Sequence, residues 1–305
     1  MRNRFINTLC DLAHSHDEIF LLCGDLGYSV LEPFADQFPN RFKNVGIAEQ
    51  NMTAVAAGLA REGYKVFTYS IGNFPTLRCL EQIRYDICYH QSDVKIVAVG
   101  AGYAYGAQGV SHHTTEDMTV MRSLPGMTVC SPADPIEANA LANYLATHNG
   151  PAYVRLNKSG EANIHDPMSD LCLTPGEPVP VRTGSRVAVL ATGAITAHAK
   201  VEIEAANKDW ALFSFPFVGD YNPAILKDLA NRFEYFLTIE EHQRAGGFGA
   251  SIIEAFSDLY VDAIIAHMPK IKRIAISDKF LSMSGSQEYL RAAAGLSLSS
   301  FFDKI

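Results

Sequence analysis

The stretch VKIVAVG, Val94–Gly100, decides the fold because, apart from Lys95, it is apolar without alternation. A strand of this kind is typical of a parallel sheet that is covered on both faces. Similar runs recur in the first half of the chain, separated by segments with apolar residues at helical spacing. These runs are IFLLCGD (19–25), YKVFTYS (64–70), MTVCSPA (127–133) and AYVRLN (152–157). The first half therefore predicts a three-layer α/β domain.

The pattern breaks between residues 159 and 186, which hold four prolines and no long periodic run. Such composition is typical of a linker between domains. Apolar runs then resume in RVAVLATG (186–193), WALFSFPF (210–217), EYFLTIEEH (234–242) and IKRIAIS (271–277). We therefore predict an α/β protein of two three-layer domains, each with a mostly parallel sheet covered by helices. The predicted domains are residues 1–160 and 186–305, and residues 161–185 form the linker.

The composition excludes several classes of partner. With 48% hydrophobic residues the chain can bury a sizeable core, and its net charge of −8 without a dense Lys/Arg cluster argues against nucleic acid or an anionic membrane as partner. No run of about 18 apolar residues suggests a membrane span, and the first residues lack a signal-peptide pattern. The six cysteines follow no paired spacing, so we predict reduced, mostly buried thiols in a cytoplasmic protein.

One carboxylate, Glu49, lies where the stretch RFKNVGIAEQNMTAVAAGLA, residues 41–60, changes from polar to small and apolar. Acids are favoured in the first turn of a helix, and Asn44 is a candidate cap nearby. The alternative is functional: burial against small apolar residues disfavours the charged form and prepares the carboxyl to share a proton. From these residues alone, the helix-dipole interpretation is favoured.

A glycine-rich loop, GAGYAYGAQGVSHHTTED (100–117), follows the strand VKIVAVG. Its GxGxxxG spacing is a weak dinucleotide signal, because no helical pattern opens at the glycines. Polar loops at the carboxyl end of a strand are where α/β proteins place ligands. His112 and His113 lack a third ligand at recognisable spacing, so a role as hydrogen-bond donor or acid/base is favoured over metal binding.

A second glycine-rich segment, EEHQRAGGFGAS (240–251), separates a strand from a helical pattern. An anion could bind at the start of such a helix. A tight turn in which glycines allow close packing is the favoured interpretation.

Taken together, these motifs resemble transketolase. The resemblance rests on GDLG (24–27), NVGIAEQNM (44–52), the aromatic and LRCLEQIR segment (74–84), GVSHHTTEDMTVMRSLPGMTVCSPADPIEA (109–138), GPAYVRLNKSGE (150–161) and EEH…GGFG. They match the family's pyrimidine-binding and C-terminal domains, in that order, over nearly the whole chain. The GDG motif with which thiamine diphosphate enzymes hold the diphosphate and Mg²⁺ is missing.

The resemblance thus implies the C-terminal half of a split transketolase, a thiamine diphosphate-dependent transferase of carbohydrate metabolism. Its implied partner is a transketolase N-terminal-type subunit that carries the diphosphate and Mg²⁺ site, in an α₂β₂ heterotetramer. The resemblance assigns no metal ligand to this chain, which we expect to be active only with its partner.

The resemblance also implies roles for individual residues. Glu49 would hydrogen-bond the aminopyrimidine ring of the cofactor and promote the imino tautomer that activates the thiazolium carbon. Phe74 would stack on the pyrimidine, and Ile71 stands where the family has a second aromatic residue. His112 would lie near cofactor and substrate, as a proton-transfer or binding group. The remaining residues that would line the cofactor pocket are Asp25 and Leu26.

Departures from the family pattern concern the substrate. Gln108 stands where an Asp that recognises a sugar hydroxyl is usual, and Gly100 or a neighbour where a histidine is usual. Lys158 replaces a phosphate-binding Arg, which keeps the charge but loses the bidentate geometry. We expect transfer of a two-carbon ketol unit between sugars or sugar phosphates, with an unusual or nucleotide-linked sugar as one substrate.

Three alternatives remain open. The chain could be the β subunit of a 2-oxo acid dehydrogenase E1 component, which shares the domain order and the glutamate, although SHHTTEDMTVMRSLPGMTVCSPAD favours transketolase. It could be a non-catalytic assembly subunit, against which the joint presence of Glu49, Phe74 and His112 argues. It could also be a nucleotide-binding oxidoreductase using GAGYAYG, which measured NAD(P) binding would support.

Overall fold

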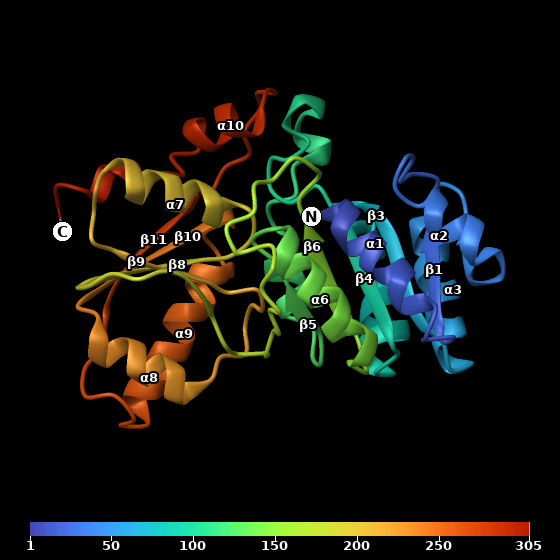
Figure 1. Ribbon diagram of the computed structural model, residues 1–305, viewed down its shortest axis with the longest axis horizontal. Coiled ribbons are helices and arrows are strands. Elements are labelled where there is room, and N and C mark those ends of the chain that lie inside the picture. Colours follow the sequence, from blue (N-terminus) through green and yellow to red (C-terminus); the bar gives the residue numbers. More distant parts are fainter. Residues whose placement is uncertain (305) are drawn as a thin grey trace.

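The first domain is built on a six-stranded parallel sheet in the order β2-β1-β3-β4-β6-β5, seen in the computed structural model, which describes residues 1–304 (Figure 1). Continuous apolar strands are buried on both faces, as all six residues of β4 show. The strands are β1 (Ile19–Cys23), β2 (Phe42–Asn44), β3 (Lys65–Ile71), β4 (Val94–Val99), β5 (Thr128–Cys130) and β6 (Ala152–Leu156).

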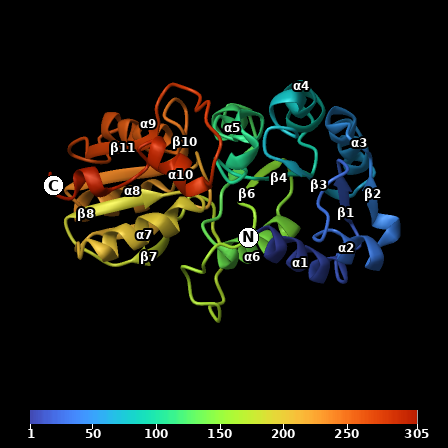
Figure 2. The same ribbon diagram turned by 90° about the horizontal axis from the view of Figure 1, so that it is seen from above.

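Helices cover both faces of this sheet (Figure 2). On one face, α1 (Arg2–Ala13) packs against α6 (Pro135–Thr147) with α2 (Glu32–Gln37) nearby. On the other lie α3 (Glu49–Arg61), α4 (Leu80–Gln82) with its π-helical continuation (Ile83–Tyr89), and α5 (Asp117–Arg122). Short 3₁₀ turns connect them: Pro39–Arg41, Leu77–Cys79, Gly106–Gln108 and Val110–His112.

The start of α6 shows how the sequence fixes one of these helices. Asp134 precedes it and accepts hydrogen bonds from the N–H groups of Ile136 (2.9 Å) and Glu137 (2.8 Å). Pro135 follows at the first helical position, where its missing N–H costs nothing. The side chain of Asp134 thereby satisfies donors that a helix start leaves unpaired.

The second domain has a five-stranded sheet in the order β11-β10-β8-β9-β7. Its strands are β7 (Val179–Arg182), β8 (Val187–Ala191), β9 (Ala211–Ser214), β10 (Tyr235–Gln243) and β11 (Lys270–Ile276). Helix α7 (Ile195–Ala205) covers one face, whereas α8 (Pro223–Arg232) and α9 (Phe248–Val261) cover the other (Figure 1). The chain ends with α10 (Gln287–Ala293) and the 3₁₀ turn Ser299–Phe301. The predicted α/β fold with two mostly parallel sheets is confirmed.

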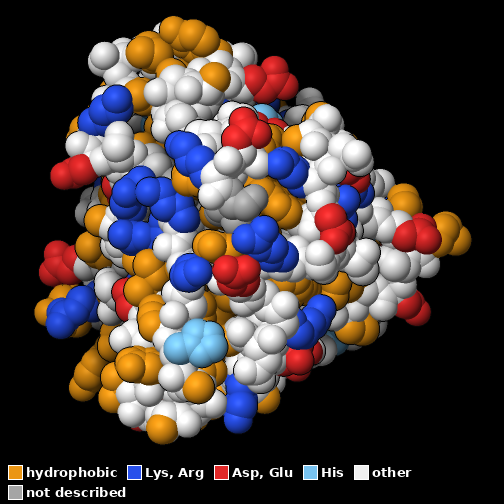
Figure 3. All heavy atoms as spheres, turned by 90° about the vertical axis from the view of Figure 1, so that its left-hand side faces the viewer, with side chains coloured by type: hydrophobic (Ala, Val, Ile, Leu, Met, Phe, Trp, Pro, Cys, Tyr) orange, Lys and Arg blue, Asp and Glu red, His pale blue; other side chains and the backbone are white. Residues whose placement is uncertain are grey.

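Strand β7 is antiparallel to β9, whereas the other pairings in this sheet are parallel. It lies within residues 161–185, the segment that the sequence predicts to be a linker. The second sheet therefore takes one edge strand from that segment. The other edge, β11, exposes Lys270 and Lys272. Lys and Arg side chains gather on the face of the molecule that Figure 3 shows. Lysines on an edge strand oppose pairing with a strand of another chain.

The two domains share a buried core. One hydrophobic cluster contains Met118 and Met121 of the first domain together with Phe215, Val218 and Phe248 of the second. These side chains are 0–5% exposed, so the contact between the domains is packed like a protein interior.

A buried ionic group adjoins this shared core. Arg155 is 3% exposed, and its Nε donates to Asp117 at 2.7 Å. Its Nη2 donates to the carbonyl oxygens of Thr114 (2.8 Å) and of Glu241 in the second domain (3.0 Å). Burial lowers the pKa of the neighbouring His242 to about 4. Arg155 is thus a cation whose hydrogen bonds cross the domain boundary.

The structure can be compared with two expectations from the sequence, free buried thiols and no membrane-spanning helix. All six cysteines are free; five are buried and Cys172 is exposed. Over the residues that the structure describes, none of the helices is both long and apolar enough to cross a membrane.

Candidate cofactor-binding site

Glu49 is the first residue of α3, and its side chain is buried with 3% exposure. Its Oε2 accepts a hydrogen bond from Nη1 of Arg78 at 3.1 Å, which forms an ion pair. The position in the first turn agrees with the helix-dipole interpretation, and the burial agrees with the functional one. The structure of Glu49 is therefore compatible with both interpretations.

Asn44 does not cap α3, which corrects the interpretation of this residue as a helix cap. Its Oδ1 accepts hydrogen bonds from the N–H groups of Asp25 (3.0 Å) and Gly46 (2.9 Å), and its Nδ2 donates to Asp25 Oδ1 at 3.0 Å. Asn44 instead ties the loop after β1 to the end of β2. Asp25 adopts a left-handed backbone with φ of 57° in this loop, and Leu26 beside it is half-buried.

Phe74 lies just after β3, whose last residue is the half-buried Ile71. The Arg78 guanidinium lies 4.7 Å from the centre of the Phe74 ring, within the range of a cation–π contact. On another side, the ring of His112 meets that of Phe74 edge-on, with centroids 5.3 Å apart and planes at 71°. Glu49, Arg78, Phe74 and His112 therefore form one continuous group of contacts.

His112 ends a 3₁₀ turn in the glycine-rich loop. Its Nδ1 lies 3.0 Å from the hydroxyl oxygen of Ser111. Partial burial, and then the charge of His113, lower the pKa of His112 below its ordinary value. His112 is therefore neutral at pH 7, with one ring nitrogen as donor and the other as acceptor.

The predicted substrate residues lie in two places. Gln108 is exposed and belongs to the same glycine-rich loop as His112. Lys158 is also exposed, but it lines a separate depression together with His198 and Gln287. Gln108 thus lies in the loop that carries His112, whereas Lys158 lies in a different depression.

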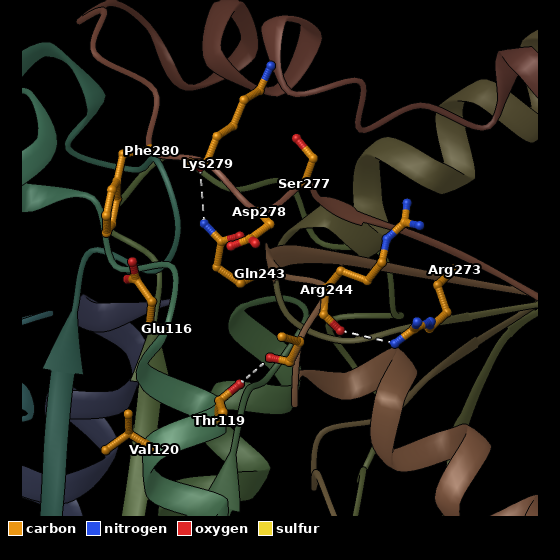
Figure 4. A pocket seen from close by; sticks show the side chains of 11 residues that line it. Glu116, Thr119, Val120, Gln243, Arg244, Arg273, Ser277, Asp278, Lys279 and Phe280 are labelled. Atoms are coloured by element: carbon orange, nitrogen blue, oxygen red, sulfur yellow. Dashed lines mark hydrogen bonds between the residues drawn. The ribbon is translucent and has the colours of Figure 1, made fainter.

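A larger cavity lies outside this group. Its volume is about 880 Å³, and it lies between α5 and the carboxyl ends of β10 and β11 (Figure 4). Arg244, Arg273 and Lys279 line it on the side of the second domain, and Glu116 lines it on the side of the first. None of the predicted site residues lines this cavity, so it is not the candidate cofactor site.

The fold and the grouped side chains together define an α/β protein with a candidate ligand site at the carboxyl edge of a parallel sheet. A buried carboxylate, an aromatic face and a neutral histidine meet there. The sequence matches the transketolase pyrimidine-binding domain over residues 1–160 and the transketolase C-terminal domain over residues 176–300. The chain belongs to the transketolase family.

Three relatives illustrate this membership. An apulose-4-phosphate transketolase subunit of Phocaeicola vulgatus is 31% identical, with 88% of this chain and 87% of that protein covered. The 6-deoxy-6-sulfo-D-fructose transketolase subunit of Clostridium sp. (strain MSTE9) is 29% identical, with 97% and 90% covered. A solved structure described as "Split gene transketolase, inactive beta4 tetramer" is 31% identical, with a TM-score of 0.84 and 99% of this chain and 95% of that one covered.

These relatives confirm the prediction of a C-terminal half of a split transketolase, and with it a transferase of the transketolase type. They favour the transketolase prediction over the E1 alternative. Membership also implies dependence on thiamine diphosphate.

The residues around Glu49 fit the pyrimidine end of that cofactor. Besides the carboxylate of Glu49 and the face of Phe74, a third group is available: the hydroxyl of Ser70, near the end of β3. It is fully buried and has no hydrogen-bond partner among residues 1–304. Buried polar atoms are normally paired, so an unpaired one beside a candidate site suits a polar ligand. Ser70 and Glu49 both lie beside Gly24, since a Cβ there would lie 3.7 Å from Cγ of Glu49 and 4.0 Å from Oγ of Ser70.

Two residues of this group, Arg78 and Ser70, could not be identified from the sequence. Arg78 lies within the LRCLEQIR segment that carried the resemblance, but its spacing from Glu49 gives no sign of an ion pair. Ser70 lies one residue before the end of an apolar strand, and a single hydroxyl there carries no sequence signal of a binding site.

Proposed function

We propose that this chain is the pyrimidine-binding subunit of a two-subunit transketolase, which transfers a two-carbon ketol unit between sugars. The proposal depends above all on the contact of Glu49, Arg78, Phe74 and His112 at one sheet edge, in a chain of this family. When bound, thiamine diphosphate supplies the nucleophilic carbon that accepts the ketol unit.

Glu49 would hold the aminopyrimidine through a hydrogen bond from its carboxyl group. Its 3% exposure excludes water from the carboxyl oxygens, which strengthens that hydrogen bond. A buried carboxyl that shares a proton with a ring nitrogen is the general acid/base that activation requires. The nearby guanidinium of Arg78 already neutralises this carboxylate within the subunit.

Phe74 would hold the pyrimidine ring by stacking, and Ile71, Asp25 and Leu26 would complete the pocket wall. His112 would face the substrate as a neutral hydrogen-bonding group or proton carrier, as its lowered pKa suits. These assignments come from the resemblance, and the placement of Glu49, Phe74 and His112 in one group supports them.

A partner subunit of transketolase N-terminal type would supply the diphosphate and Mg²⁺ site in an α₂β₂ assembly. Two observations support this arrangement: the chain has no GDG motif, and it covers nearly the full length of relatives named as transketolase subunits. The description of the solved relative as an inactive tetramer also supports the need for a second kind of chain. We place the assembled enzyme in the cytoplasm, in line with the free thiols.

The substrates would be sugars or sugar phosphates outside central pentose metabolism. Gln108, exposed in the His112 loop, would meet a sugar hydroxyl, and Lys158 a phosphate or other anion brought near by the assembly. The relatives named for apulose-4-phosphate and 6-deoxy-6-sulfo-D-fructose support an unusual sugar as one substrate.

The test is reconstitution. The chain is co-purified from its host, the bound protein is identified by mass spectrometry, and ketol transfer is measured with thiamine diphosphate and Mg²⁺. We expect activity only from the complex and a loss of about 100-fold or more for Glu49→Gln. Turnover by the isolated chain would refute the two-subunit proposal, and normal turnover of Glu49→Gln in the complex would refute the role of that residue.

A further inference from the structure

The second domain carries none of the residues that the proposed function assigns to the cofactor or the substrate, yet one of its side chains binds the loop that presents His112. We propose that Glu241, at the carboxyl end of β10, is a positioning residue that holds loop 100–116 in the shape that presents His112. The inference rests on the proposed function for its kinetic consequence, and its structural part can be tested without activity.

Glu241 is buried, with 4% exposure, and its Oε1 accepts a hydrogen bond from the backbone N–H of Tyr103 at 2.6 Å. The side chain also packs directly on Gly102. A Cβ at Gly102 would lie 2.5 Å from Cγ of Glu241, and φ of +57° at this glycine is left-handed as well. The loop therefore approaches the carboxylate as closely as a glycine allows.

The carboxylate is fixed from its own domain. Nε of Arg291, in α10, donates to Oε2 at 2.5 Å, and Nε2 of Gln287 lies 3.0 and 3.1 Å from the two oxygens. Arg291 is itself 9% exposed, so the pair is shielded from water. Charge-assisted hydrogen bonds of this kind are roughly twice as strong as neutral ones, so Glu241 is a rigid support for the Tyr103 amide.

The loop carries this constraint to His112. Gly102 and Thr114 exchange two backbone hydrogen bonds of 2.9 Å, which closes the loop on itself. The Tyr103 ring meets the His113 ring edge-on, with centroids 5.0 Å apart, and Asn73 donates to the His113 carbonyl oxygen at 2.6 Å. The two residues that follow His112 are therefore tied to Gly102 and Tyr103, the residues that Glu241 contacts.

A second contact from the same domain meets the loop further along. At Gly106 a Cβ would lie 2.3 Å from Cδ1 of Leu290 and 2.8 Å from the carbonyl oxygen of Gly285. The N–H of Gly285 donates to the Gly106 carbonyl oxygen at 3.2 Å. The turn that leads to Gln108 is thus packed against α10 and the residues before it, so the second domain supports the loop here as well as at Glu241.

The chain offers a matched control in Glu240, the neighbour of Glu241 on the same strand. Glu240 is fully buried and accepts hydrogen bonds from Phe248 N (2.6 Å) and Gly249 N (2.8 Å), both within the second domain. Replacing either glutamate by glutamine perturbs a buried carboxylate of β10, but only Glu241 touches the loop. A general loss of stability would affect both variants.

The first measurement is hydrogen–deuterium exchange of the full chain for wild type, Glu241→Gln and Glu240→Gln. A glutamine can satisfy Tyr103 or Arg291 but not both, so we expect Glu241→Gln to speed exchange over residues 101–115 by about ten-fold or more. Glu240→Gln should speed exchange around residues 247–250 and leave 101–115 as in wild type. Wild-type exchange over 101–115 in Glu241→Gln would overturn the proposal.

The second measurement is kinetic and uses the reconstituted complex. We expect Glu241→Gln to lower kcat by about ten-fold through misplacement of His112, while the affinity for thiamine diphosphate stays unchanged because Glu49 and Phe74 lie outside the loop. Equal losses in Glu240→Gln and Glu241→Gln would overturn the positioning role. If the wild-type complex performs no ketol transfer, the proposed function fails, and the exchange measurement still decides the inference.

A third variant guards against a Glu241→Gln protein that does not fold. Arg291→Gln keeps the carboxylate that accepts from Tyr103 and removes its charged support. We expect faster exchange over residues 101–115 than in wild type, and an unchanged rate there would overturn the proposed route through α10.

Discussion

Replacing Arg78 by methionine tests how strongly the ion pair with Arg78 stabilises the buried carboxylate of Glu49 in the isolated subunit. The Nη1–Oε2 distance is 3.1 Å, the Glu49 side chain is 3% exposed and that of Arg78 is 49% exposed. A hydrogen bond to a charged group contributes about 1.5–3 kcal/mol when shielded, whereas an exposed ion pair contributes about 0.2–1 kcal/mol. With one partner buried and the other half in water, we expect a coupling of about 1.5 kcal/mol.

Arg84 provides the control. Its guanidinium lies 4.7 Å from the centre of the Tyr85 ring, the same distance that separates Arg78 from Phe74, and it forms no ion pair with any residue between 1 and 304. Each cation–π contact contributes about 0.5–1 kcal/mol at an exposed site, so this part is common to both variants. Arg78→Met should therefore lower the free energy of unfolding by about 2–2.5 kcal/mol and Arg84→Met by about 0.5–1 kcal/mol.

The assay is urea unfolding of the full chain, followed by circular dichroism and by the fluorescence of its single tryptophan, Trp210. Coincident transitions would justify two-state free energies. A double-mutant cycle with Glu49→Gln then isolates the coupling between the two side chains. A coupling below about 0.3 kcal/mol would refute the claim that Arg78 neutralises the buried carboxylate.

Three further outcomes are expected. Because the pKa of His112 is lowered, kcat/KM of the complex should stay level above about pH 6.5 and fall only as His112 is protonated below that pH. His113→Asn should move the acidic limb of the pH–rate profile to higher pH, and an unmoved limb would contradict the effect of His113 on His112. Phe74→Leu should weaken thiamine diphosphate binding to the complex by about 2- to 12-fold in calorimetry, and an unchanged Kd argues against stacking. Arg155→Met leaves Asp117 buried without its cationic partner, so urea unfolding should show a loss of about 3–5 kcal/mol; a loss under about 1 kcal/mol refutes the place of Arg155 in the domain contact.

The sequence predicts the α/β fold well because the central strands are continuous apolar runs, which β4 and β8 illustrate. The edge strands β2 and β7 escape prediction for a physical reason. They are three and four residues long, and their residues are half-buried or exposed. Their strand conformation depends on pairing with the neighbouring strand, because their own residues form no apolar pattern. The linker interpretation of residues 161–185 overlooked β7 for this reason.

Only those residues of the candidate site that have a signal in the local sequence could be predicted. Glu49 stands out because it lies where a polar stretch changes to small apolar residues, and the family resemblance adds Phe74 and His112 to the same site. Arg78 and Glu241 act through contacts that the fold creates, across 29 residues to Glu49 and 138 residues to Tyr103. No spacing rule reaches over such separations, so these two residues required the structure.

The core shared by the two domains limits how this polypeptide can be divided. Cutting the chain between the sheets would expose Met118 and Met121 on one fragment and Phe215 and Phe248 on the other. It would also leave the Arg155 guanidinium without the Glu241 carbonyl oxygen. Two fragments made by a break at this point would each carry a large exposed apolar patch, which favours aggregation in water. The two domains therefore behave as one unit that is made and kept as a single polypeptide.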